Sequence, residues 1–241
     1  MLALVVATLT TSIVAALPVE AAKTPARIHP ECVRVRDHAK AMRFRTADGL
    51  RLAGVMLGNG STGVVLAHQL RSDLCEWMPF ARVLASNGFR VLAFDFRGYG
   101  ASSPRAGRLT KDADVVAAAR ALRAQGVRDV ALMGGSMGGT AVLTASAELR
   151  VPPRAVVGLS SPAEFGGMDA TAAVARTTVP LLLLVSQDDV DFVPDQRTLF
   201  QASTSPEKRL EILPGREHGA RILSRRSARA LVLAFLEGHR S

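Results

Sequence analysis

The chain is poor in residues that mark several protein classes. Among its 241 residues are two cysteines, Cys32 and Cys75, and 5% aromatic residues, against 48% hydrophobic residues overall. Neither cysteine has the spacing of a zinc ligand, so no metal or other cofactor is expected. Nucleic-acid surfaces interleave aromatic and basic side chains, so the few aromatics argue against nucleic-acid binding despite a net charge of +9. The hydrophobic fraction instead indicates a globular protein with a full-size core.

No internal repeat and no low-complexity linker interrupts the chain, and one apolar run stands apart at its start. Residues 2–17 carry no charge and are followed by Pro18 and by small residues up to Ala22. We predict a secretory signal peptide over residues 1–22, atypical because no Lys or Arg precedes the run. An uncleaved membrane anchor is the alternative, although the run is shorter than the roughly 20 residues that span a bilayer. The protein is therefore expected to be exported, whether secreted, periplasmic or in the cell envelope.

Strand-like and helix-like segments alternate along the rest of the chain. After an N-terminal arm (residues 23–40), residues 41–241 are expected to form a single domain of the α/β class. Such alternation predicts a mostly parallel central sheet with helices on both faces, preceded by an N-terminal β-hairpin. The expected strands are 41–45, 50–57, 63–67, 90–95, 128–133, 154–159, 180–186 and 208–213, and the expected helices are 78–87, 111–125, 138–149, 169–176, 195–203 and 219–237.

A glycine-flanked serine follows one predicted strand directly. Residues 129–139 read Asp-Val-Ala-Leu-Met-Gly-Gly-Ser-Met-Gly-Gly, and an Ala-rich predicted helix comes next. This pattern is typical of a nucleophile elbow, in which a tight strand-to-helix turn exposes the Ser136 hydroxyl and leaves room only for glycine at Gly134 and Gly138. The alternative is a structural turn whose serine caps the helix from Thr140 onward.

A nucleophilic serine needs a histidine base and an acid that orients it, later in the chain in the order Ser, Asp or Glu, His. His218 has this order and lies in a loop after the predicted strand 208–213, unlike the other four histidines. The acidic loop 186–194 follows another predicted strand and offers the acid. Ligands of parallel α/β sheets bind beyond the carboxyl ends of the strands, where all three groups are expected to lie.

The chain resembles the α/β-hydrolase family from about Ala41 to its C-terminus. Besides the elbow, the residues that carry the resemblance are the turn at 95–102, Asp-Phe-Arg-Gly-Tyr-Gly-Ala-Ser, and the acid loop ending in Val193-Pro194. The family usually places the acid three residues after a strand-terminal glycine, here replaced by Ser186, which implies Asp189. Asp191 is the alternative.

The resemblance also implies two backbone N–H donors for the oxyanion of the reaction intermediate. One is the amide of Met137, directly after the elbow serine. The other belongs to a loop where the family commonly reads His-Gly-x and this chain reads His68-Gln69-Leu70. The resemblance points to the Leu70 amide, with Gln69 as the alternative because a side chain replaces the glycine. His68 is expected to be a structural loop histidine.

The resemblance implies a serine esterase acting through an acyl-enzyme. The region between Ser160 and Pro180, where the family inserts lids, is only about a helix long, so small or short-acyl esters are the expected substrates. A peptidase or an acyltransferase would use the same groups, and a catalytically silent binding module is a third alternative.

Two further expectations concern the surface and the cysteines. Cys32 and Cys75 fit one disulfide in an exported protein, which would join the N-terminal arm to the rim of the site, although two free thiols are the alternative.

Arg221, Arg225 and Arg229 recur at helical spacing in the last predicted helix. They are expected to form a solvated face, with attraction to an anionic membrane surface as the weaker alternative.

Overall fold

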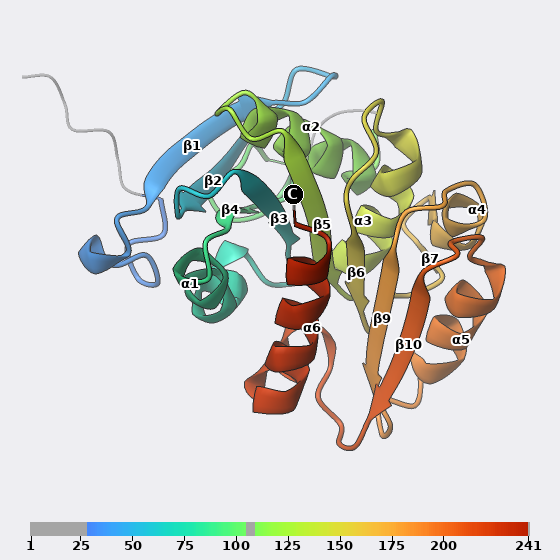
Figure 1. The fold of residues 1–241 in the computed structure, drawn as a ribbon. Coiled ribbons are helices and arrows are strands. Elements are labelled where there is room, and N and C mark those ends of the chain that lie inside the picture. The colour runs from blue at the N-terminus through green and yellow to red at the C-terminus, as the bar shows by residue number, and fades with distance from the viewer. Residues whose placement is uncertain (1–27, 105–108, 241) are drawn as a thin grey trace, which may run out of the picture.

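One mixed β-sheet organises the structure, a computed structural model that describes residues 28–104 and 109–240. Its eight strands lie in the order β1-β2-β4-β3-β5-β6-β9-β10 (Figure 1). The first two strands form the predicted N-terminal hairpin, and β2 pairs antiparallel with β4. All further pairings are parallel. The strands are β1 (Lys40–Arg45), β2 (Arg51–Leu57), β3 (Thr62–Ala67), β4 (Arg90–Phe94), β5 (Asp129–Gly135), β6 (Val156–Leu159), β9 (Leu181–Ser186) and β10 (Lys208–Leu213).

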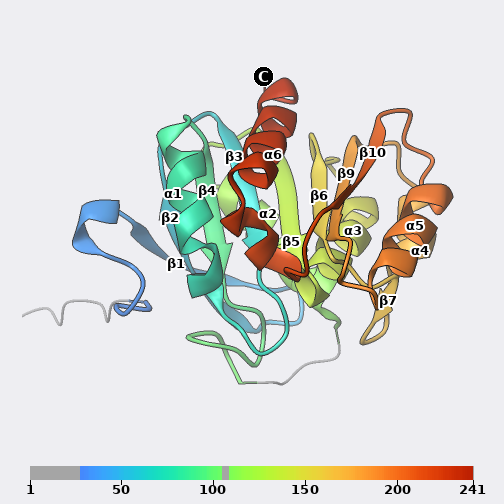
Figure 2. The ribbon, with the colours of Figure 1, turned by 90° about the horizontal axis from the view of Figure 1, so that it is seen from below.

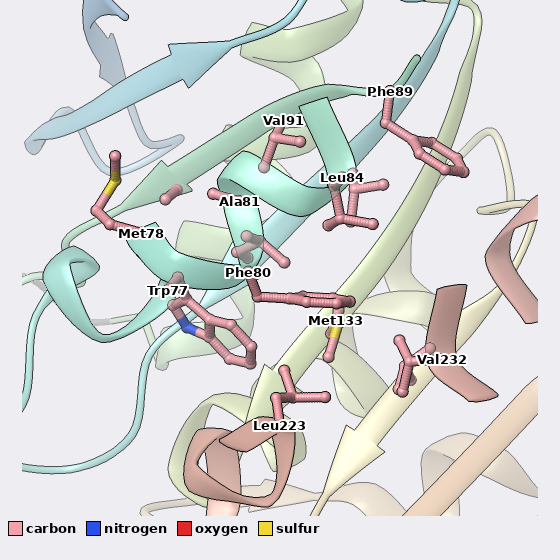
Figure 3. Packing of buried hydrophobic residues seen from close by; sticks show 14 of the residues in the cluster. Trp77, Met78, Phe80, Ala81, Leu84, Phe89, Val91, Met133, Leu223 and Val232 are labelled. Atoms are coloured by element: carbon pink, nitrogen blue, oxygen red, sulfur yellow. The ribbon is translucent and has the colours of Figure 1, made fainter. Parts of the chain in front are cut away.

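Helices cover both faces of the sheet, as the alternating sequence pattern predicts. Successive side chains of a strand point to opposite faces, so Val64 and Leu66 of β3 enter one core while Val65 and Ala67 enter the other. The first core is closed by α1 and α6 (Figure 3), and the second by α2 to α5, with α3 across the sheet from α6 (Figure 2). The helices are α1 (Met78–Ser86), α2 (Lys111–Arg123), α3 (Met137–Glu148), α4 (Ala170–Val174), α5 (Val193–Ala202) and α6 (Arg226–Gly238).

The C-terminal helix differs from its prediction. Instead of one helix over 219–237, the chain forms a 3₁₀ helix, η3 (Gly219–Ser224), and then α6. Arg225 separates them in extended conformation, with ψ 131°. The break places Ile222 and Leu223 in the core shared with α1, and Arg225 pairs with Glu217 at 2.9 Å. Tertiary packing of two adjacent apolar residues therefore overrides the helical pattern.

The arginines expected on one helical face consequently take separate roles. Arg221 is exposed on η3, whereas Arg229 on α6 donates to the Leu223 carbonyl at 2.9 Å. Arg225 is held by its ion pair with Glu217. Because the three belong to different elements, they do not form the single stripe that the sequence suggested.

The segment between β6 and β9 is short. It holds a two-stranded hairpin, β7 (Glu164–Phe165) and β8 (Met168–Asp169), and then α4. The hairpin was not predicted, because its strands are two residues long and are joined by Gly166 and Gly167, both at positive φ. Met168 and Val174 are buried against the sheet, so the segment's apolar side chains belong to the core.

The N-terminal arm is fastened to the domain by a disulfide. Cys32 is bonded to Cys75, which confirms the pairing expected for these two cysteines. Cys75 lies in a short 3₁₀ helix, η2 (Leu74–Trp77), between β3 and α1, and a second one, η1 (Val35–Asp37), lies in the arm itself. The predicted signal peptide lies outside the described residues. None of the helices within the described ranges is long and apolar enough to cross a membrane.

Candidate active site

The elbow serine has a backbone conformation that few residues adopt. Ser136 joins β5 to α3 with φ 49° and ψ −122°, where the side chains of L-residues are strained. Two backbone hydrogen bonds hold it there: its N–H donates to the Leu159 carbonyl at 2.8 Å, and its carbonyl accepts the Thr140 N–H at 3.1 Å. Strain of this kind persists only where the surroundings impose it, so the fold fixes the direction in which the Ser136 side chain leaves the backbone.

The glycines of the elbow are required by close backbone approach, as the sequence predicted. A Cβ at Gly134 would lie 2.1 Å from the carbonyl oxygen of Gly138. A Cβ at Gly138 would lie 2.2 Å from the Ala67 carbonyl oxygen at the end of β3. Both distances are shorter than any tolerable contact, so glycine at these positions lets α3 start directly against the ends of β5 and β3.

The loops after β9 and β10 bring an acid and a base together. Asp189 accepts a hydrogen bond from Nδ1 of His218 at 2.9 Å. A hydrogen bond joins the two loops, because the Ser186 hydroxyl donates to the Glu217 carbonyl at 2.6 Å. The centres of the Phe192 and His218 rings lie 4.3 Å apart. Asp191, the alternative acid, is exposed. A carboxylate on Nδ1 leaves Nε2 of His218 as the nitrogen available to a neighbouring hydroxyl.

The histidine loop lies directly against the elbow. A Cβ built on Gly135 would be 2.9 Å from the Ala220 nitrogen, and one built on Gly219 would be 3.7 Å from the Ser136 nitrogen. The Gly219 N–H also donates to the Ser160 hydroxyl at 3.2 Å, after β6. The loops after β5, β6, β9 and β10 thus meet at the carboxyl edge of the sheet, where the sequence placed the three candidate residues.

The two candidate oxyanion donors after β3 differ in their hydrogen bonds. The Gln69 N–H donates to Oε1 of Glu76 at 2.9 Å. Within the described residues the Leu70 N–H meets no acceptor, and Leu70 is 44% exposed. Met137 is the first residue of α3, where backbone N–H groups point out of the helix and its dipole favours negative charge.

His68 is a structural residue, as its sequence position predicts. It is fully buried; Nδ1 bonds the Gln69 carbonyl at 2.8 Å, and Nε2 accepts the Phe96 N–H at 3.1 Å. A carbonyl on one nitrogen and an N–H on the other fix the neutral tautomer with the proton on Nδ1. Burial lowers the pKa of His68, which agrees with that neutral state.

A cavity of about 530 Å³ opens beside the histidine loop. Its wall combines apolar side chains of α1 and η3 with Gln69 and Glu76 from the segment after β3. Glu76 was not among the residues predicted for the site, because its contact with Gln69 crosses a turn and follows no motif. Burial raises the pKa of the Glu76 carboxyl to about 7.

Among the described residues, two groups of side chains place possible metal ligands within 4.8 Å of one another. One comprises His29, Glu31, Cys32 and Cys75, whose two sulfurs are bonded to each other. The other comprises His29, Asp73 and Asp95. These carboxylates already serve the fold: Asp73 accepts the Cys75 N–H, and Asp95 accepts the N–H groups of Leu74 and Ala101. The group therefore functions as a hydrogen-bond centre that joins the arm to β4 and η2.

Comparison with known proteins gives the same fold. A model of the α/β hydrolase fold family matches residues 63–235. An esterase from Pyrococcus furiosus superposes with a TM-score of 0.77 at 18% identity, over 90% of this chain and 96% of that one. The esterase domain of a Rhodothermus marinus protein gives 0.64 at 25% identity, over 82% and 95%.

A relative of a different description matches part of the chain. It is the dihydrolipoyllysine-residue acetyltransferase component of the acetoin cleaving system of Cupriavidus necator, 33% identical over 131 residues. The match covers 54% of this chain and 34% of that protein. The family model matches well over half of the chain, and the solved structures share its fold. This chain therefore belongs to the α/β-hydrolase fold family.

Proposed function

We propose that the protein is a serine carboxylesterase. The Ser136 hydroxyl attacks the ester carbonyl while His218 takes its proton, and the Met137 and Leu70 N–H groups bind the oxyanion. When the intermediate collapses, His218 returns the proton to the leaving alcohol, and Ser136 holds the acyl group. Water then attacks this acyl-enzyme with the same base, which releases the carboxylic acid and restores Ser136. Asp189 keeps the imidazole in the required tautomer throughout.

The hydrogen bond between Asp189 and His218 is the observation that carries this proposal. It joins an acid and a base from separate loops, at 2.9 Å, next to a serine in strained conformation. His68 is fully buried and held by backbone groups, whereas His218 is partly exposed and faces a carboxylate at the end of the sheet where Ser136 lies. An oriented, accessible base beside a strained serine is the arrangement that acyl transfer needs.

We propose small or short-acyl esters as substrates. Long acyl tails need an apolar cover that excludes water, because each buried methylene is worth about 0.8 kcal/mol only when it leaves water. The segment between β6 and β9 buries Met168 and Val174 in the core and so has few apolar side chains to form such a cover.

The Cys32–Cys75 disulfide supports export, since such bonds persist in oxidising compartments. On this proposal the enzyme acts outside the cytoplasm.

The partial match to an acetyltransferase component favours a second candidate, acyl transfer to an alcohol or thiol. Both functions share the acyl-enzyme, and they differ in whether water or another acceptor attacks it. Hydrolysis of aryl esters, measured with and without added alcohol, separates them, since a transferase forms the new ester in preference to the free acid. Amide substrates test the peptidase alternative in the same assay.

The decisive variant is Ser136→Ala. We expect it to lower kcat by at least on the order of a thousandfold and to abolish fluorophosphonate labelling, because only the nucleophile is removed. A purified, folded variant that kept a tenth of the wild-type rate would exclude Ser136 as the nucleophile. Absence of labelling and of turnover in the wild type would favour the silent binding module.

A further inference from the structure

A buried carboxylate supports the turn that follows β3. Oε1 of Glu76 accepts the Gln69 N–H at 2.9 Å, and the Ser72 hydroxyl also bonds the Glu76 carboxyl. Glu76 thus holds both ends of the turn made by residues 69–72, which contains the exposed Leu70 and Arg71 at φ 59°. We call residues 69–72 the β3–η2 turn.

The helix that carries Glu76 is itself fixed on several sides. Cys75 is bonded to Cys32, and its N–H donates to the Asp73 cap at 2.8 Å. Leu74 and Trp77 are fully buried, and the Leu74 N–H donates to the buried Asp95 at 2.9 Å. Because η2 cannot shift without breaking these contacts, Glu76 presents its carboxyl to the β3–η2 turn from a rigid base.

The hydrogen bond also decides which amide of the turn is free. The Gln69 N–H is occupied by Glu76, whereas the Leu70 N–H has no acceptor within the described residues. Position 69 has a side chain where the family commonly has glycine, so the turn cannot rely on a glycine conformation to aim the next amide. An external acceptor that fixes the Gln69 peptide compensates for that loss.

We propose that Glu76 is a positioning residue for the oxyanion site: its carboxyl holds the Gln69 N–H and thereby aims the Leu70 N–H at the reacting carbonyl. This inference rests on the proposed esterase function. Glu76 does not touch the substrate's reacting atoms, and its effect passes through the backbone of the β3–η2 turn. Pre-aimed donors act on the charge that develops in the transition state, so the effect belongs to kcat.

Three variants test the proposal. Glu76→Ala removes the acceptor, Glu76→Gln keeps a carbonyl oxygen in the same place without the charge, and Glu148→Ala removes an exposed carboxylate on α3 as the control. Loss of one oxyanion donor costs about a hundredfold to a thousandfold in kcat, so a misaimed donor in Glu76→Ala is expected to cost about tenfold to a hundredfold. KM is expected to change less than about threefold, because ground-state binding is not involved.

The conservative variant separates positioning from packing. Glu76→Gln is expected to recover most of the kcat lost in Glu76→Ala, while Glu148→Ala behaves as the wild type. Unchanged kcat in Glu76→Ala overturns the proposal, as does equal loss of kcat in Glu76→Ala and Glu76→Gln. Should Glu76→Ala fail to fold, the wild type and Glu76→Gln still decide the question through their pH dependence.

The pH dependence follows from the burial of Glu76. Burial raises the pKa of the Glu76 carboxyl to about 7. The nearby Asp73 carboxylate adds to this increase, and the Arg221 guanidinium opposes it. Arg229 of α6 lines the same cavity. An ionised carboxylate accepts a stronger hydrogen bond than a neutral acid. The ratio of wild-type kcat to Glu76→Gln kcat is therefore expected to rise between pH 6 and pH 8. A flat ratio overturns the proposal, because only the wild type has an ionisable carboxyl that holds the Gln69 N–H.

A measurement that does not depend on turnover tests the positioning role of Glu76 separately from the esterase function. In Ser136→Ala, the backbone amide resonance of Gln69 is expected to shift with a midpoint near pH 7, and this inflection is expected to vanish when Glu76→Gln is added. An unshifted Gln69 resonance overturns the positioning role. Inactivity of the wild type on every ester would instead overturn the esterase function, and the resonance would still report whether Glu76 holds the turn.

Discussion

Removal of the Cys32–Cys75 disulfide is expected to destabilise the protein substantially. The double variant Cys32→Ala/Cys75→Ala opens a loop of 43 residues. A cross-link of that span restricts the unfolded chain by an entropy worth about 4 kcal/mol at 25 °C. Because small domains are stable by only about 5–15 kcal/mol, this loss is a large part of the total.

The folded arm retains other contacts once the disulfide is gone. His29 bonds Asp95 at 2.8 Å and Glu31 at 2.6 Å, and Arg82 holds Asp37 at 2.8 Å. Burial alone would lower the pKa of His29, but its hydrogen bonds to Glu31 and Asp95 outweigh burial and raise it. The stabilisation from His29 is therefore complete below pH 6.5 and is lost as the pH rises through its raised pKa.

Two measurements check this expectation. Urea unfolding gives the free-energy difference between wild type and variant, and trypsin digestion after the exposed Arg34 and Arg36 reports release of the arm. We expect faster cleavage of the variant at pH 8 than at pH 6, relative to a folded control protein that corrects for the pH dependence of trypsin. An identical urea midpoint and slope in both proteins would refute the reasoning, because the disulfide would then not restrict the unfolded chain.

Three further predictions concern the candidate site. Asp189→Asn is expected to lower kcat by about 10⁴-fold, because an amide at this position favours the wrong His218 tautomer, while Asp191→Asn is expected to have little effect. A larger loss of kcat in Asp191→Asn than in Asp189→Asn would make Asp191 the acid. Gly138→Ala is expected to lower the melting temperature and to slow fluorophosphonate labelling, because its Cβ would lie 2.2 Å from the Ala67 carbonyl oxygen. A variant with the melting temperature and labelling rate of the wild type would contradict this close approach. Among aryl esters from acetyl to palmitoyl, kcat/KM is expected to peak at short chains without a jump above the solubility limit, and a palmitoyl preference that rises on emulsified substrate would show that a lid exists.

Local sequence was enough to predict the α/β fold and to locate the candidate residues. Apolar runs and helical patterns predicted most strands and helices to within a few residues, because the central strands β3, β4, β5, β6 and β9 are buried and helices such as α1 and α6 bury one apolar face. The elbow could be predicted because close backbone contacts admit only glycine at Gly134 and Gly138. Chain order led to His218 and to the acidic loop 186–194, since parallel strands end at one edge of the sheet. Within that loop the resemblance to the family implied Asp189, with Asp191 as the alternative.

Only the tertiary structure decided how distant segments meet. The break at Arg225 depends on the core that Ile222 and Leu223 enter beside α1, and this packing is not visible in the local sequence. The contact between Glu76 and Gln69 depends on the path of a turn, and the disulfide depends on an arm folding back over 43 residues. A sequence specifies its local preferences residue by residue, whereas these contacts join groups whose proximity arises only after the sheet and its covering helices have packed.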